Sequence, residues 1–311
     1  MKRFLVTGGA GFIGSHIVEY LVKRGYFVRV LDNFSTGKKE NLKEVLNKIE
    51  LVQGDIRSLE TCFKVTRGID FVLHQAALRS VPKSLEIPEV YNEVNIQGTL
   101  NLLKASLRNR IKRFVFASSS SVYGQVKRFP EKEDFLPSPF SPYGLTKLTG
   151  EYYCQIYQKQ FGLSTVSLRY FNVFGPRQAI DDEYAVVIPK FISCLLRDQS
   201  PPIYGTGKQS RDFTYVSNVV EANFLAATKR SLTKNIFNIA SGKSYTILEL
   251  LKILKKITKK QIDPVFLPVR AGDVFKTHAD ISQAKRLLGF KPKIDFMEGL
   301  RLTVQYFQEN V

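Results

Sequence analysis

The sequence has few of the residues from which metal centres and disulfide frameworks are built. Three cysteines and three histidines occur in 311 residues, and neither type is clustered. Cys62, Cys154 and Cys194 form no CxxC pair, which argues for reduced thiols and against a disulfide framework or a zinc site. We therefore expect a cytoplasmic protein that binds no metal.

Long apolar runs are also missing. No uninterrupted stretch reaches the roughly 18 residues that a membrane-spanning helix requires. The first residues, Met1–Phe4, lead directly into a strand and a glycine loop, which predicts that no signal peptide is present. We expect no membrane partner. The apolar fraction of 44% and the charged fraction of 24% are typical of a globular protein with a large core.

Acidic side chains are much fewer than basic ones. The chain has 28 Asp and Glu against 46 Lys and Arg, a formal net charge of +18. Such an excess can indicate binding to nucleic acid or to a membrane surface. The densest lysine run, residues 252–260, accompanies apolar residues at helical spacing, and Thr246 with Glu249 forms a capping box before it. A solvated helix face explains these lysines better, so we expect no nucleic-acid partner. An anionic substrate fits the charge equally well.

The N-terminal residues follow the order strand, glycine turn, helix and strand. Arg3–Thr7 is predicted as a buried strand, and a helix follows the turn Gly8–Gly14 and continues to about Arg24. A second strand, Phe27–Leu31, ends at Asp32, 18 residues after Gly14. This is the full context that a dinucleotide-binding fingerprint requires, although its glycines are spaced GxxGxxG.

The chemistry of these residues favours one dinucleotide. Glycines at positions 8, 11 and 14 would let the backbone approach a pyrophosphate at the helix N-terminus. Asp32 would accept hydrogen bonds from the adenosine ribose hydroxyls, and its charge would repel a 2′-phosphate. The sequence therefore predicts NAD rather than NADP.

Strands and helices continue to alternate as far as Pro176. Strands are predicted at 49–53, 71–74, 113–117 and 165–169, with helices at 88–108 and 143–161. This order predicts the α/β class, with a Rossmann-type doubly wound parallel sheet and a smaller C-terminal α/β substrate domain. A later strand, Ile236–Ile239, is expected to return to the main sheet. The predicted domains are 1–176 with about 214–242 for NAD, and 177–213 with 243–311 for the substrate.

Residues at the ends of these predicted strands extend the expected cofactor site. Asp55 could reach the adenine, and the small residues Ala76 and Ala77 leave room for a flat ring. The residues expected to bind NAD are Gly8, Gly11, Phe12, Ile13, Gly14, Asp32, Asn33, Ser35, Gly37, Asp55, Ile56, Gln75, Ala76, Ala77, Asn95, Tyr143, Lys147 and Tyr170.

Tyr143 and Lys147 are the candidate catalytic pair. They lie four residues apart at the start of a predicted helix, a spacing that places both side chains on one face. An ammonium group beside a phenol favours the phenolate, which can then act as a base nearer neutral pH. The serine run Ser118–Ser121 could add a hydroxyl to the same site. Surface helices often carry such pairs by chance, but the dinucleotide fingerprint favours the functional interpretation.

With these residues placed, the chain resembles the extended short-chain dehydrogenase/reductase family, in its NAD-dependent nucleotide-sugar epimerase/dehydratase branch. Within that branch it looks closest to the UDP-N-acetylglucosamine (UDP-GlcNAc) and UDP-glucose 4-epimerases. The segments that carry the resemblance are Thr7–Gly14, Ser118–Gly124, Tyr143 with Lys147, Leu168–Pro176, Ser210–Phe213 and Arg270–Asp273.

The resemblance implies 4-epimerisation of a UDP-hexose through a transient 4-keto sugar. Tyr143 as phenolate would take the proton of the sugar 4-hydroxyl, and Lys147 would lower the tyrosine pKa and bind the nicotinamide ribose. Ser119, with Ser120 as the fallback, would hydrogen-bond the reacting oxygen. Asn172 and Arg211 match positions that hold the UDP phosphates. The implied substrate-binding residues are Ser119, Ser120, Ser121, Tyr143, Asn172, Val187, Arg211, Arg270, Asp273 and Thr277.

Three departures from relatives inform the substrate. Ser120 and Ser121 stand where related dehydratases and decarboxylases place an acid, which disfavours elimination. Thr277 stands where epimerases restricted to non-acetylated sugars have a tyrosine, so we expect acetylated sugars to be accepted. Arg79 replaces a small residue and could favour a uronate. A UDP-glucuronate 4-epimerase, a reductase or decarboxylase of the same fold, and a non-catalytic NAD-binding regulator remain as alternatives.

The resemblance also implies a homodimer. Relatives usually pair the helices near 88–108 and 143–161 into a four-helix bundle. Tyr152, Tyr153 and Ile156 would suit that contact, and their burial inside the monomer is an equal alternative.

Overall fold

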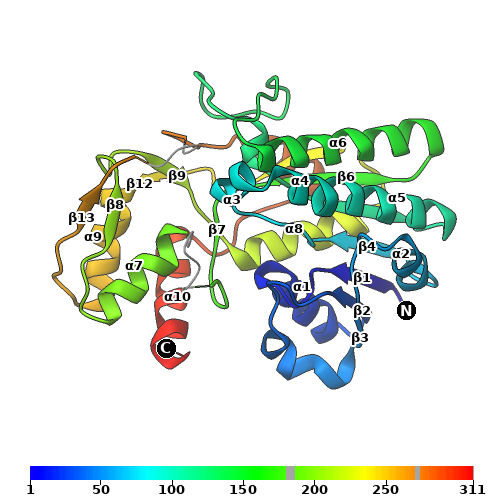
Figure 1. Ribbon diagram of the computed structural model, residues 1–311, viewed down its shortest axis with the longest axis horizontal. Helices are drawn as coiled ribbons and strands as arrows, with labels where there is room; N and C mark the ends of the chain where they lie inside the picture. Colours follow the sequence, from blue (N-terminus) through cyan, green and yellow to red (C-terminus); the bar gives the residue numbers. More distant parts are fainter. Residues whose placement is uncertain (180–185, 270–273, 311) are drawn as a thin grey trace.

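A seven-stranded parallel sheet forms the centre of the protein, as the sequence predicts (Figure 1). The computed structural model describes residues 1–179, 186–269 and 274–310. The strand order is β11-β6-β5-β4-β1-β2-β3. The chain first builds the sheet outward from β1 to β3 and then from β4 to the opposite edge, so the topological switch point lies between β1 and β4. Parallel sheets of this kind bind ligands at the carboxyl ends of the strands beside that switch point. The strands are β1 (Arg3–Thr7), β2 (Phe27–Asp32), β3 (Glu50–Gln53), β4 (Phe71–His74), β5 (Arg113–Ser119), β6 (Thr165–Tyr170) and β11 (Ile236–Ile239).

Helices cover both faces of this sheet. Successive side chains of a strand point to opposite faces, and β1 shows the consequence. Phe4 and Val6 join the hydrophobic cluster that includes α1 (Phe12–Lys23) and α8 (Val216–Thr228). Leu5, between them, joins the cluster on the other face. The helices on that face are α2 (Leu59–Thr66), α5 (Gly98–Arg108) and α6 (Pro142–Phe161).

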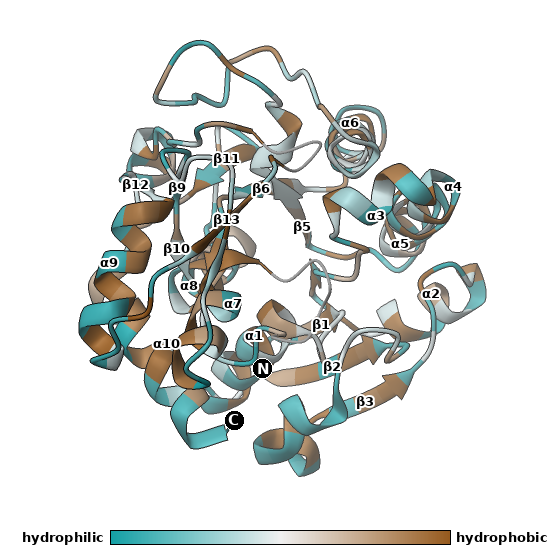
Figure 2. Cartoon of the chain, turned by 60° about the vertical axis from the view of Figure 1, so that its left-hand side comes forward, coloured by the Kyte–Doolittle hydropathy of each residue, from teal (hydrophilic) through white to brown (hydrophobic). Residues whose placement is uncertain are grey.

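A second group of elements lies beside the carboxyl edge of the sheet (Figure 1). Helices α7 and α10 pack against α9, on which hydrophobic and hydrophilic residues alternate (Figure 2). Thr246 and Glu249 form the predicted capping box at the start of α9. The predicted domain boundaries stay a prediction. The elements here are α7 (Val187–Leu196), β8 (Pro202–Tyr204), β9 (Ser210–Asp212), β12 (Ser244–Thr246), α9 (Ile247–Thr258), β13 (Val265–Leu267) and α10 (Phe296–Asn310).

The predicted helix over 88–108 is not one regular helix. Its first turn, α4 (Pro88–Tyr91), passes into a π-helical segment, Asn92–Gln97, before α5 begins. The side chain of Asn95, in the π segment, bonds the backbone of Leu78 on a separate loop. Helix periodicity could not reveal this, because π segments depend on such tertiary contacts.

The remaining elements are short. Within the residues described, no helix is both long and apolar enough to cross a membrane. These elements are 3₁₀ helices at Lys39–Lys48 and Ser120–Val122, α3 (Val81–Glu86), β7 (Val173–Phe174), β10 (Thr214–Tyr215) and a π-helical turn at Ala284–Leu288.

Candidate active site

The glycine turn after β1 fits a pyrophosphate. Gly8 has φ +66°, and a Cβ there would lie 2.7 Å from the backbone nitrogen of Ala76. A Cβ at Gly14 would lie 2.1 Å from the Gly8 carbonyl oxygen, so neither position accepts a larger residue. Gly11 precedes α1 and offers no side chain to cap it. The first N–H groups of α1 are therefore available to an anion.

Asp32 ends β2 with its carboxylate turned toward this turn. Its Oδ2 accepts a hydrogen bond from the Ala10 backbone nitrogen at 2.9 Å, and its Oδ1 accepts one from Phe34 at 2.8 Å. A Cβ on Gly37 would lie 2.9 Å from both carboxylate oxygens. The fold thus holds a negative charge where the sequence predicts the adenosine ribose. A phosphate on that ribose would meet like charge.

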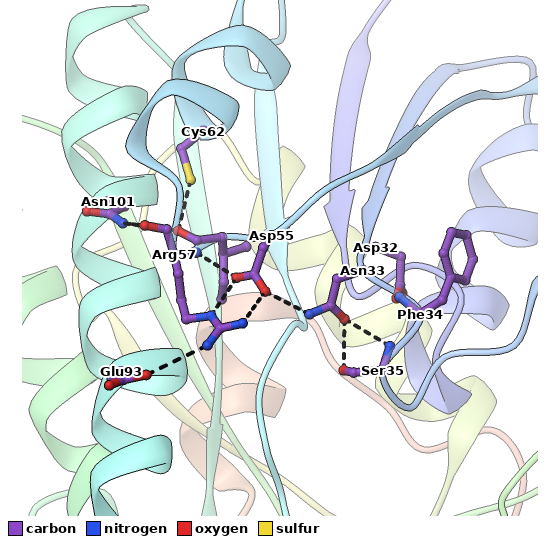
Figure 3. A network of polar contacts seen from close by, with 10 residues as sticks. Asp32, Asn33, Phe34, Ser35, Asp55, Arg57, Cys62, Glu93 and Asn101 are labelled. Atoms are coloured by element: carbon purple, nitrogen blue, oxygen red, sulfur yellow. Dashed lines mark hydrogen bonds and ion pairs between the residues drawn. The ribbon is translucent and has the colours of Figure 1, made fainter.

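A polar network joins the ends of β2 and β3 (Figure 3). Asn33 donates a hydrogen bond to Asp55 Oδ2 at 2.9 Å, which brings the two predicted adenosine-side residues together. Arg57 donates to both Asp55 oxygens, at 3.1 and 2.9 Å, and lies 3.7 Å from Glu93. The hydrogen bond from Arg57 is the main cause that lowers the pKa of Asp55 to about 2. Sequence reasoning missed Arg57, whose only signal is its place two residues after Asp55.

Two elements, β5 and α6, bring the three predicted catalytic residues together. Ser119 ends β5, and its side chain lies near Tyr143, at the start of α6, and lowers the tyrosine pKa. Lys147, one turn later, lies with its Nζ 5.9 Å from the Tyr143 ring centre and donates a 2.8 Å hydrogen bond to the Ala117 carbonyl. The Ser119 hydroxyl donates its hydrogen to the Ser121 hydroxyl at 3.1 Å. The three residues lie at the carboxyl edge of the sheet, two strands from the glycine turn.

The expected lowering of the tyrosine pKa is not found in this structure. Burial raises the pKa of Tyr143, and the Ser119 hydrogen bond and the charge of Arg79 offset only part of that rise. Burial also lowers the pKa of Lys147 to about 7. Both shifts follow from desolvation, which disfavours the phenolate and the ammonium alike. Moreover, the lysine hydrogen-bonds a backbone carbonyl instead of the phenol.

Two of the predicted sugar-nucleotide residues, Val187 and Arg211, come from the second group of elements, and Asn172 comes from the end of β6. Asn172 follows β6 and donates hydrogen bonds to the Asp212 carbonyl and to the Thr277 hydroxyl, at 3.1 and 2.9 Å. Arg211, on β9, donates to the backbone carbonyls of Ser210 and Phe275. Val187 begins α7. Arg270 and Asp273 lie outside the described residues.

Asp212, which sequence reasoning missed as a contributor, is the centre of this part of the site. Its carboxylate is fully buried and accepts hydrogen bonds from Ser241, Gly242 and Ala279. Burial raises the pKa of Asp212 to about 6. The carboxylate ties β9 to the turn after β11 and to the segment that carries Thr277. Asp212 belongs to the motif Ser210–Phe213, from which sequence reasoning assigned a role to Arg211 alone.

Three predicted cofactor residues, Asn95, Tyr170 and Gln75, already form hydrogen bonds within the protein. Asn95 bonds the backbone of Leu78 through both ends of its amide, and its Nδ2 also donates to Thr146. The Tyr170 hydroxyl donates to Asn223 Oδ1 at 3.0 Å. Gln75 Nε2 donates to the same Asn223 oxygen at 3.1 Å. Direct contacts of these side chains with NAD stay predictions. Among the described residues, no three His, Cys, Asp or Glu side chains gather in a metal-binding arrangement.

A glycine turn at a helix N-terminus, an acid at the end of β2 and a Tyr–Lys–Ser group at the carboxyl edge of the sheet are typical of a dinucleotide-dependent enzyme. The family model described as "NAD dependent epimerase/dehydratase family" matches residues 4–240. The chain belongs to this family, a branch of the extended short-chain dehydrogenases/reductases, and its cofactor is NAD.

Individual relatives align over nearly the whole chain. A putative UDP-glucose 4-epimerase from Methanocaldococcus jannaschii is 40% identical, with 98% of each chain covered. The UDP-N-acetylglucosamine 4-epimerase of Methanobrevibacter ruminantium, solved with UDP-N-acetylmuramic acid, is 43% identical, with 100% and 99% coverage and a TM-score of 0.95. The UDP-glucuronic acid 4-epimerase of Bacillus cereus, solved with UDP-glucuronic acid and NAD, is 36% identical, with 99% and 100% coverage and a TM-score of 0.91.

Proposed function

We propose that this protein interconverts the 4-epimers of UDP-hexoses, with UDP-GlcNAc and UDP-GalNAc as substrates together with UDP-glucose and UDP-galactose. The observation that carries the proposal is the convergence of Ser119, Tyr143 and Lys147 at the carboxyl edge of the sheet that bears the glycine turn. A hydroxyl, a phenol and an amine at that edge are suited to moving one proton on and off a sugar oxygen.

Each of the three side chains has a separate task. Tyr143 Oη takes the proton from the sugar 4-hydroxyl and later returns it. Ser119, which lies near Tyr143 and lowers its pKa, orients that oxygen. Lys147 Nζ, fixed by the Ala117 carbonyl, adds positive charge beside the phenol when it is protonated. Bound NAD⁺ supplies the hydride acceptor at C4 and a positive charge that favours the phenolate.

A panel of three nucleotide sugars tests the reaction. Purified protein is incubated separately with UDP-glucose, UDP-GlcNAc and UDP-glucuronate, and the sugars are separated and identified. We expect 4-epimers of the first two and no net accumulation of NADH. Release of carbon dioxide or stoichiometric NADH would instead identify a decarboxylase or a dehydrogenase, and the proposal would be rejected.

Acceptance of acetylated sugars is argued from Thr277. Its side chain is only 6% exposed, and a tyrosine in its place would extend into the space beside Asn172. Thr277→Tyr is expected to reduce turnover of UDP-GlcNAc more than that of UDP-glucose. The substitution also removes the hydroxyl that bonds Asn172, so Thr277→Val, which keeps the size, is the matched control. Undiminished UDP-GlcNAc turnover in Thr277→Tyr would contradict this assignment.

A second candidate substrate is UDP-glucuronate, and Arg79 favours it. The charge of Arg79, on the loop after β4, lowers the pKa of Tyr143, and we infer that the guanidinium lies on the side of the site that receives the sugar. A uronate carboxylate beside this guanidinium would gain a favourable ion pair. If the panel shows turnover of UDP-glucuronate, Arg79→Gln should reduce it at least tenfold and leave UDP-GlcNAc turnover unchanged.

The homodimer is also a proposal. Three apolar side chains of α6 are about half exposed: Leu145 at 52%, Tyr152 at 51% and Ile156 at 47%. Tyr153 packs partly against the hydrophobic cluster beneath the helix. An exposed apolar face on one long helix is the kind of surface that a second copy covers.

A further inference from the structure

The side chain of Asn172 is held in one orientation. Its residue follows β6 and has φ +33°, a backbone conformation that asparagine tolerates better than most residues. Nδ2 lies 3.1 Å from the Asp212 carbonyl oxygen and 2.9 Å from Thr277 Oγ1. A primary amide has two N–H groups, and these two acceptors use both.

The Asp212 carbonyl decides which end of the amide faces the protein. A carbonyl oxygen can only accept a hydrogen bond, so the atom beside it must be the nitrogen of Asn172. Thr277 Oγ1 reinforces this arrangement, because it accepts from the Asp212 backbone nitrogen at 3.1 Å as well as from Asn172. Flipping the amide would place two acceptors against each other.

The frame around this contact is rigid. Asp212 is fully buried, and its carboxylate accepts four hydrogen bonds, from Ser241 N and Oγ, Gly242 N and Ala279 N. The Thr277 backbone nitrogen bonds the Ser210 carbonyl at 3.1 Å. Neither acceptor of the Asn172 amide can therefore move without breaking several bonds.

Asn172 lies at the carboxyl edge of the sheet, where the substrate is proposed to bind. Tyr170, two residues earlier, pairs with Ser119 in the β5–β6 register, so Asn172 lies just beyond the catalytic serine. The residue is partly exposed, and no described residue donates a hydrogen bond to its Oδ1. The Asn172 side chain therefore presents its Oδ1, a hydrogen-bond acceptor, to a ligand. An acceptor suits a hydroxyl or amide donor and repels a phosphate.

We propose that the Thr277 hydroxyl is a positioning group for substrate recognition. It holds the Asn172 amide so that Oδ1 accepts a hydrogen bond from a donor on the sugar. Asn172 thus recognises the sugar and contributes no side-chain donor to the phosphates, in contrast to the expectation from the sequence. The inference rests on the proposed binding of a UDP-sugar at this site and adds a residue role to it.

Substitutions at Thr277 that differ only in the hydroxyl test the inference. Thr277→Val keeps the shape and removes the acceptor, and Thr277→Ser keeps the acceptor. Dissociation constants for UDP-GlcNAc, UDP-glucose and UDP alone are measured by calorimetry on the NAD-loaded protein, together with KM, kcat and Tm. We expect Thr277→Val to weaken binding of the turned-over UDP-sugar about tenfold. Affinity for UDP alone should stay within about twofold, and Thr277→Ser should restore sugar binding.

Thr214 provides a matched control. It is a fully buried threonine two residues from Asp212, and its Oγ1 has no hydrogen-bond partner among the described residues. Thr214→Val should leave all three affinities unchanged. The inference is overturned if Thr277→Val binds the UDP-sugar like wild type, or if UDP and UDP-sugar weaken equally as Tm falls. If wild type binds UDP-sugars but forms no 4-epimer, the proposed reaction fails while the affinities still decide the role of Thr277.

Discussion

At the scale of single residues, burial changes the chemistry that sequence spacing suggests. Tyr143 and Lys147 have the expected spacing on α6, yet the buried environment pushes both toward their neutral forms. The spacing of two residues in the sequence gives the distance between their side chains along a helix. It does not give the cost of removing each from water, which depends on every element packed around them.

The buried amine of Lys147 predicts a pH-dependent stability. Its pKa falls from 10.5 to about 7 in the folded protein. Between these values the unfolded chain binds a proton that the folded chain does not, so the Lys147 contribution to stability rises with pH across this window. Below about pH 7 the full penalty of burying the charge applies.

Chemical denaturation of NAD-free protein from pH 6 to 10 measures this contribution. The stability of wild type relative to Lys147→Met should increase with pH, by about 1.4 kcal/mol for each unit of pKa shift. Lys159, exposed near the end of the same helix, is the control, and Lys159→Met should give a flat difference. A flat profile for Lys147→Met would show that its amine is solvated.

At the scale of elements, a buried ion pair ties together the strands and the helix that carry the catalytic residues. Glu151 on α6 accepts two hydrogen bonds from Arg169 on β6, at 2.9 and 2.7 Å. Ser118, next to Ser119 on β5, donates to the same carboxylate at 2.5 Å. Both charged side chains are at most 2% exposed. Removing one partner leaves a buried charge without compensation.

Glu151→Gln is therefore expected to destabilise the protein by about 3–5 kcal/mol in urea denaturation. Replacing both partners, as Glu151→Leu with Arg169→Met, should cost less than the single change, because no charge is left unpaired. Glu298, in an exposed ion pair with Arg301, is the comparison, and Glu298→Gln should change stability by less than about 1 kcal/mol. A loss no larger for Glu151→Gln than for Glu298→Gln would contradict this account.

The same scale separates what the sequence could predict from what it could not. Short apolar runs between turn signals located β1, β4 and β11, because buried parallel strands are continuous hydrophobic segments. The glycine turn and the end of the helix predicted at 143–161 are confirmed, and Gly162, with φ +71°, ends that helix in a conformation that suits glycine. The π segment around Asn95 could not be predicted, because Asn95 bonds Leu78 on a separate loop. The Arg57–Asp55 pair joins residues only two apart, but that spacing does not fix how the two side chains turn.

At the scale of the whole molecule, the exposed apolar face of α6 predicts self-association. A lysine at position 156 would place a charge in the proposed contact, where it would have to be desolvated. Ile156→Lys is therefore expected to halve the mass measured by sedimentation or light scattering. Leu136, 87% exposed on a loop outside this face, is the control, and Leu136→Lys should keep the wild-type mass. Equal masses for all three proteins would reject this contact surface.

The basic excess of the molecule does not gather at the candidate site alone. The lysine run at 252–260, on α9 and just beyond its end, is partly neutralised, because Lys255 pairs with Asp263 and Lys260 with Asp198. These pairs support the interpretation of that run as a solvated helix face. The expectation that no nucleic acid binds stays a prediction.

The most direct test of the central claim is the turnover of Tyr143→Phe with the UDP-sugar that the substrate panel identifies. Loss of the phenol oxygen should lower kcat by about 10²–10⁴-fold, the range for a removed general acid–base group, while NAD content and Tm are retained. Tyr152→Phe, a change on the exposed face of the same helix, should leave kcat unchanged. A kcat for Tyr143→Phe within about twofold of wild type would contradict the account.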